Sequence, residues 1–207
     1  TIDNLIKKED VNKVELSTEQ RNALQEVFKS SMPKLDKTEF YIVFDAQGAE
    51  SNPVMLTQSE YMRRMREMSK MQPGMAFYGE MPESYNLVLN TDHPLVKSVL
   101  EDEEKACSEQ LKPIQDDIKG WEARQSDLRE QQNKKKEDEI TAEEKEDMKN
   151  TNEKLDTLRE QRNKILADYA VNNKIVSQLI DLALLGNGML KGEALSRFIK
   201  RSVSLIG

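Results

Sequence analysis

The chain has little of what most catalytic and metal sites are made from. Among its 207 residues are one cysteine, Cys107, and one histidine, His93. A lone cysteine excludes an internal disulfide framework and is typical of a reducing compartment. A lone histidine leaves a histidine-based metal site or a catalytic triad without partners, and no glycine-rich phosphate loop is present. We therefore expect no catalytic, metal or cofactor-binding residue here, with Cys107 an idle thiol and His93 a structural residue.

Long apolar runs are missing too. No stretch is long enough to cross a bilayer and none has the pattern of a signal peptide, so we expect no membrane partner. Hydrophobic residues make up only 37% of the chain and charged residues 33%, which predicts long exposed helix beside a modest core. The net charge of −7, without a large basic block, argues against a nucleic-acid partner.

The first hundred residues read as a small α+β unit. Ser17 and Gln20 form a capping-box pattern ahead of an amphipathic helix. Three β-branched or aromatic runs, 40–44, 54–56 and 84–90, predict three strands. The sequence therefore predicts a small three-stranded sheet packed with helices.

Two further helix starts are predicted in the same region. Thr57 and Glu60 form a second capping-box pattern, and the helix that follows runs to about residue 71. Thr91 or Asp92 is predicted to cap a helix whose first turn holds Pro94.

The helix after Thr57 carries an unusual methionine stripe, and large apolar residues continue in the loop beyond it. Because methionine is flexible and polarizable, such a stripe suits a surface that binds varied unfolded segments. The alternative is that these side chains simply cover the sheet. The predicted client-binding residues are Tyr61, Met62, Met65, Met68, Met71, Met75 and Phe77.

Residues 101–166 are dense in charge and poor in apolar side chains. Mostly apolar residues, with some Gln, Thr and Arg, recur there at alternating three- and four-residue steps, first from Ile114 and again up to Ile165. If the chain folds back at a tip near residues 139–140, these two rows of residues face each other. Thr141 and Glu144 would then cap the returning helix. This pattern predicts a protruding antiparallel coiled-coil arm; a disordered charged insertion is the alternative.

The chain ends in two amphipathic helices separated by a stop signal, Gly186-Asn187-Gly188. Lys191, Arg197, Lys200 and Arg201 are predicted to lie on the solvent side of the second helix. The apolar sides either pack on the chain's own domain or form a four-helix bundle with a second copy. The predicted dimerisation residues are Ile175, Leu179, Leu182, Ala183, Leu185, Leu195, Phe198, Ile199 and Val203.

Three segments carry a family resemblance. They are Ser-Asn-Pro-Val-Met-Leu-Thr with Ser-Glu-Tyr-Met at 51–62, Leu-Val-Leu-Asn-Thr-Asp-His-Pro-Leu-Val-Lys at 87–97, and the stretch 181–201. Together they resemble, in the right order, the C-terminal domain of the heat-shock protein 90 chaperones, and most of all its bacterial members. The resemblance covers residues 17–100 and 167–206.

The resemblance implies a cytoplasmic, homodimeric, ATP-dependent chaperone that binds unfolded clients during protein folding and the stress response. Residues 1–16 would be a linker from a preceding middle domain, and 17–207 a C-terminal dimerisation domain with a coiled-coil insertion at 101–166. Helices 170–186 and 192–206 would form the dimer bundle, and Tyr61, Met62, Met65 and Met68 would match the family's client-contacting helix. The ATP and magnesium sites would lie in an N-terminal domain outside these residues.

The arm at 101–166 is much longer than the corresponding connection in typical bacterial members, so the resemblance assigns it no role. A second class of function therefore stays open. In that alternative the protein is a scaffold or adaptor whose arm recruits one specific partner.

Overall fold

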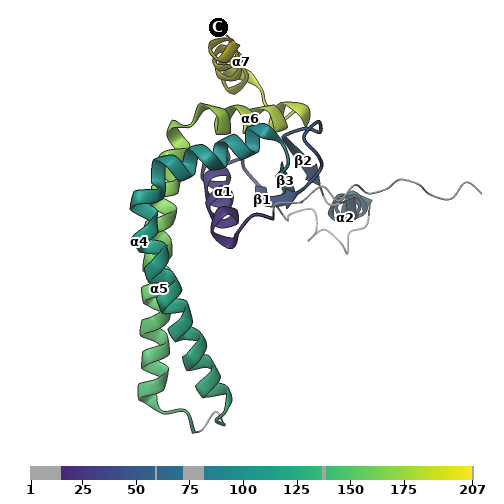
Figure 1. Cartoon of the computed structure of the whole chain (residues 1–207). Helices are drawn as coiled ribbons and strands as arrows, with labels where there is room; N and C mark the ends of the chain where they lie inside the picture. The colour runs from purple at the N-terminus through teal and green to yellow at the C-terminus, as the bar shows by residue number, and fades with distance from the viewer. Residues whose placement is uncertain (1–14, 59, 72–81, 137–138, 207) are drawn as a thin grey trace, which may run out of the picture.

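A small mixed sheet organises the part of the chain that the computed structural model describes, residues 15–58, 60–71, 82–136 and 139–206 (Figure 1). Its strands are β1 (Thr38–Asp45), β2 (Val54–Gln58) and β3 (Glu83–Asn90). The central strand, β3, is parallel to β1 and antiparallel to β2, and Leu87 of β3 is in register with Ile42 and Leu56. The three predicted strands are therefore present, within an α+β fold.

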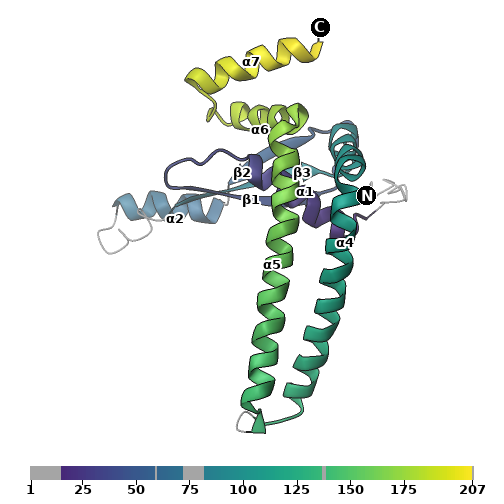
Figure 2. The same cartoon turned by 90° about the vertical axis from the view of Figure 1, so that its left-hand side faces the viewer.

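Four helices form the layer next to this sheet. They are α1 (Thr18–Ser31), the long α4 (Pro94–Asn133) and α5 (Ala142–Asn172), and α6 (Lys174–Gly186). Helix α1 contacts β1 and α6 contacts β2, whereas α5 packs on α1, α4 and α6. Two further helices lie farther out: α2 (Glu60–Met71) projects to the side of the sheet, and α7 (Gly192–Ile206) lies beyond α6 (Figures 1 and 2). The fold thus carries three projections, namely α2, α7 and the distal halves of α4 and α5.

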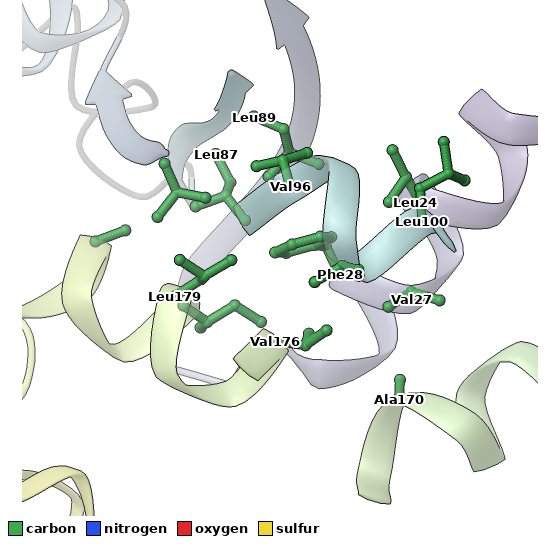
Figure 3. Packing of buried hydrophobic residues seen from close by; sticks show 14 of the residues in the cluster. Leu24, Val27, Phe28, Leu87, Leu89, Val96, Leu100, Ala170, Val176 and Leu179 are labelled. Carbon is green, nitrogen blue, oxygen red and sulfur yellow. The ribbon is translucent and has the colours of Figure 1, made fainter. Parts of the chain in front are cut away.

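The main core joins all of these layers except α2. Phe28 of α1 is fully buried, between Leu87 and Leu89 of β3 and Val96 of α4 (Figure 3). Val176 and Leu179 bring α6 into the same cluster. Because a buried Phe-to-Ala change costs about 3–5 kcal/mol, this cluster dominates the stability of the fold.

Side-chain caps fix most helix starts. The predicted capping boxes at Ser17–Gln20 and Thr141–Glu144 are both present. The predicted box at Thr57 is wrong, because Thr57 belongs to β2, which runs on to Gln58. The predicted cap at Thr91 or Asp92 falls instead at His93, whose Nδ1 accepts the backbone N–H of Leu95 at 3.1 Å.

One asparagine ends a long helix and starts the next. Asn173 is the C-cap of α5 and the N-cap of α6, and its Oδ1 accepts the backbone N–H groups of Ile175 and Val176, each at 3.0 Å. Its Nδ2 donates to Tyr169 Oη at 2.7 Å. The bundle helix was predicted to begin at residue 170. It starts only at Lys174, because Asn173 ends α5 and caps the start of α6.

The distal parts of α4 and α5 run antiparallel and project away from the sheet (Figures 1 and 2). Pro113 lies inside α4, where a proline removes one helical hydrogen bond and favours a bend. Near this point the main core ends, and a separate small cluster of Ile118, Leu155 and Leu158 begins, with Trp121 packed against it. The arm is thus an antiparallel helix pair, and its regular coiled-coil packing stays a prediction.

Toward the tip of the arm polar contacts replace the apolar ones. Gln125 Nε2 donates to Asn152 Oδ1, and Arg124 forms a 2.6 Å ion pair with Asp147. Lys135 also pairs with Glu144. Since exposed ion pairs contribute only about 0–1 kcal/mol each, most of the stability of the arm comes from its proximal cluster.

A buried carboxyl group lies on the core-facing side of α4. Glu103 is 3% exposed, and its Oε1 has no hydrogen-bond partner among the described residues. Burial, with a smaller contribution from Glu104, raises the pKa of Glu103 from 4.5 to about 7. Between these values the folded state holds the proton and the unfolded state releases it, so the contribution of Glu103 to stability falls as the pH rises from 4.5 to 7.

We predict that Glu103→Gln stabilises the chain at pH 8 by about 1–3 kcal/mol, because a neutral amide avoids the cost of a buried charge. At pH 4.5 the gain should largely vanish, since the wild-type carboxyl is then protonated in the fold. Urea unfolding at fixed protein concentration at both pH values measures this. Glu101→Gln, an exposed site on the same helix, should show no such pH-dependent gain, and an equal gain at both pH values would contradict the prediction.

Candidate functional site

Helix α6 divides its apolar residues between two sides. Val176, Leu179, Ile180, Ala183 and Leu184 are buried, because this side of α6 packs on the sheet and α1. Two of the nine predicted dimerisation residues, Leu179 and Ala183, are therefore covered by their own chain and not available to a partner.

The other side of α6 stays open. Leu182 and Leu185 are exposed, and Ile175 is only partly buried at the edge of the core. Aliphatic side chains exposed on a helix next to the core are the usual sign of a further packing surface.

Helix α7 lies on the side of α6 away from the sheet (Figures 1 and 2). Leu195 and Phe198 pack partly against the main core, whereas Ile199 is 53% and Val203 66% exposed. We call the four exposed residues Leu182, Leu185, Ile199 and Val203 the terminal aliphatic surface.

A polar cluster holds α7 on α6. The guanidinium of Arg201 pairs with the carboxylate of Asp181, and its Nε donates to Gln178 Oε1 at 2.9 Å. Gln178 Nε2 in turn donates to Ser202 Oγ. Arg201 was predicted on the solvent side of α7, but its side chain and that of Asp181 are mostly buried between the helices.

These contacts fix the orientation of α7 before any partner binds. A charge-assisted, multidentate guanidinium holds its neighbours in one geometry better than apolar packing alone. The terminal aliphatic surface is therefore presented by a pre-organised helix pair, which lowers the entropic cost of association.

The second predicted surface, on α2, stands apart from the core. No described residue of α2 belongs to the main core, and Met71 is 85% exposed, with Tyr61 and Met68 also exposed. Met65 is partly buried. These exposures disfavour the alternative in which the stripe merely covers the sheet.

Ion pairs along the exposed side of α2 add to the stability of the helix. Arg64 pairs with Glu60 at 2.5 Å and Arg63 with Glu67 at 2.7 Å, both at i,i+4 spacing. Such pairs add about 0.2–0.5 kcal/mol each to an isolated helix. Of the other predicted client-binding residues, Met75 and Phe77 lie outside the described residues, as does the side chain of Met62.

Within the described part of the chain, no group of three or more histidine, cysteine or acidic residues is arranged to hold a metal ion. Cys107 is buried in the main core, where desolvation raises the pKa of its thiol. No helix in the described segments is both long and hydrophobic enough to cross a membrane. What these segments do present is apolar surface on two projecting helices, which is suited to binding.

Comparison with known proteins gives one consistent match. The chain is 51% identical over 205 residues to the chaperone protein HtpG of Bacteroides thetaiotaomicron, and 51% identical to that of Bacteroides fragilis, in each case over 99% of this chain. It is 43% identical over 206 residues to HtpG of Porphyromonas gingivalis. No family model and no solved structure matches.

These alignments run through the arm as well as the sheet and the terminal helices, because they cover 99–100% of the chain. The chain spans about 30% of the length of the relatives it matches. It therefore matches a fragment of bacterial HtpG, a chaperone of the heat-shock protein 90 family.

Proposed function

We propose that this chain, which matches a fragment of HtpG, is the homodimerisation and client-contact region of an ATP-dependent chaperone in the bacterial cytoplasm. Its own residues supply assembly and binding. The ATP and magnesium of the parent protein would be held outside them. Dimerisation would keep the two ATP-hydrolysing regions at high effective concentration, so that they can close on each other.

The single observation that carries the proposal is the terminal aliphatic surface. Ile199 and Val203 are more than half exposed on a helix that is otherwise fixed to its neighbour by Arg201. A second copy related by a two-fold axis would place the same surfaces face to face and form a four-helix bundle. A stable interface of this kind buries on the order of 1,600 Å² in total.

Client contact would fall to α2. Its exposed Tyr61, Met68 and Met71 can adapt to many apolar segments, whereas the ion-paired arginines keep the helix soluble when no client is bound. In Figure 1 α2 projects from the sheet in a direction different from that of α7. A dimer formed through α7 would therefore leave α2 accessible.

We predict that Ile199→Asp combined with Val203→Asp gives a folded monomer. Both side chains are exposed in the single chain, so the change spares the core but would place unpaired carboxylates in the bundle. Sedimentation equilibrium would show at least a hundredfold weaker association, since burying a charge costs several kcal/mol.

The matched control is Tyr41→Asp with Leu95→Asp, which changes two other exposed apolar residues, on β1 and α4. This control should dimerise as the wild type does. Unchanged association of the Ile199/Val203 variant would exclude these residues from the interface.

For client contact we predict that Met68→Gln with Met71→Gln, made in the full-length protein, weakens suppression of client aggregation roughly tenfold. Each substitution removes apolar contact worth on the order of 1 kcal/mol. Light scattering of a heat-unfolded test protein, titrated with chaperone, measures the effect. Met148→Gln on α5 is the control, and equal loss in both variants would argue against a specific role for α2.

An adaptor function for the arm is the second candidate, and one observation favours it. The arm has a hydrophobic cluster of its own, formed by Ile118, Leu155 and Leu158, and extends well beyond the main core (Figure 2). Such a projection is not needed to bury the sheet or to present α7.

Replacing residues 114–165 by a short glycine-serine linker separates the two candidates. Leu111 and Leu166, the last core residues on either side, are kept, so the domain should still fold. Under the chaperone proposal dimer mass and suppression of aggregation should stay within about twofold of wild type, since the fully buried residues of the main core and both proposed binding surfaces lie outside the deletion. If the full-length deletion variant still suppresses aggregation but loses one partner in a pull-down, the arm is an adaptor as well. If the variant no longer suppresses aggregation, the assignment of client contact to α2 is contradicted.

A further inference from the structure

Methionine side chains differ in exposure according to the element that carries them. Among the methionine side chains that the structure describes, only Met68 and Met71 are exposed, by 44% and 85%, and both lie on α2. The others are partly buried, namely Met32, Met55, Met65, Met148 and Met189. The accessible thioether sulfur of the described chain is therefore concentrated on the proposed client-contact helix.

The exposure of α2 rises around the helix axis. Ser69 is buried, and Met65, one turn before it on the same side, is partly buried. Met68 and Met71, three residues apart, lie on the side that turns to solvent. Because α2 projects from the sheet (Figure 1), and none of its described residues belongs to the main core, both sulfur atoms are open to small reagents in solution.

An exposed thioether reacts with hydrogen peroxide. A lone pair of the sulfur attacks one peroxide oxygen, an S–O bond forms and the O–O bond breaks. The sulfur loses two electrons, and the departing hydroxide takes the proton of the transferred oxygen and leaves as water. The product is methionine sulfoxide, which is polar and chiral, and which stereospecific reductases convert back to methionine.

We propose that Met68 and Met71 form a reversible, peroxide-sensitive modification site, and that their oxidation releases apolar clients from α2. This proposal rests on the proposed client-contact role of α2. A sulfoxide replaces the apolar thioether by a strong dipole that loses its hydration when an apolar client covers it, so the client surface is lost. The ion pairs of Arg63 and Arg64 involve neither sulfur, so the helix itself remains.

The other proposed binding surface is chemically inert to the same reagent. The terminal aliphatic surface consists of leucine, isoleucine and valine, and it contains no sulfur. Met32 and Met189 pack against the main core, where contact with dissolved peroxide is reduced. Oxidation should therefore remove client binding and leave dimerisation intact.

Peptide mass spectrometry of the full-length protein, sampled during treatment with dilute hydrogen peroxide, tests the site itself. Sulfoxide should form at Met68 and Met71 at least about threefold faster than at Met32 and Met189, because a partly buried sulfur meets the reagent less often. Equal rates at all four positions would overturn the proposal. This readout involves no client, so it is independent of the proposed function.

Suppression of client aggregation by the full-length protein, compared before and after treatment, tests the consequence. Oxidation should weaken suppression by the wild type roughly tenfold, as predicted for Met68→Gln with Met71→Gln. Met68→Leu with Met71→Leu cannot form these sulfoxides, so its suppression should change less than about twofold relative to its own untreated sample. Met148→Leu, which keeps both α2 sulfur atoms, should lose as much as the wild type.

Incubation with the two stereospecific sulfoxide reductases should restore suppression, and the dimer mass from light scattering should stay unchanged throughout. An equal loss in the leucine double variant, or loss of the dimer, would overturn the proposal. If the glutamine double variant is impaired but the oxidised wild type is not, only the modification site is wrong. If the glutamine double variant suppresses aggregation like the wild type, the client-contact role of α2 fails, and this proposal fails with it.

Discussion

The packing of one side of α6 against the sheet and α1 is the constraint on which the rest of the structure depends. Val176, Ile180 and Leu184 are almost fully buried there, and this fixes the opposite side of α6 as the place where α7 must dock. Arg201, Asp181 and Gln178 then set the orientation of α7. A helix held from one side by the core and from the other by a polar cluster can present aliphatic residues outward without collapsing onto its own domain.

The three projections point in different directions, and this separates the tasks that the chain can perform. Helix α7 and the arm lie toward opposite ends of the molecule, and α2 projects to the side (Figures 1 and 2). Association through α7 would therefore block neither α2 nor the arm.

Much of this architecture could be predicted from local patterns in the sequence. The β-branched runs gave the three strands, and Ser17 and Thr141 identified two helix starts, because capping boxes act within four residues. The glycine stop after α6 is also present, with Gly188 at φ +67°. Family resemblance, rather than periodicity, gave the chaperone assignment, which the match to HtpG supports.

What could not be predicted depends on contacts between distant segments. Periodicity placed Leu179 and Leu182 on one apolar stripe, but only the packing of α6 shows that the first is buried and the second exposed. From the sequence, Arg201 is predicted to be exposed to solvent, because its partner, Asp181, lies on another helix. Likewise, nothing near Glu122 in the sequence indicates that it pairs with Arg159 on the other helix of the arm.

The central claim is that the terminal aliphatic surface is covered by a second copy of the same chain. Multi-angle light scattering of the unmodified chain across a dilution series tests it most directly. The account predicts twice the chain mass at high concentration, falling toward the monomer mass only on strong dilution. A monomer mass throughout the series would contradict it.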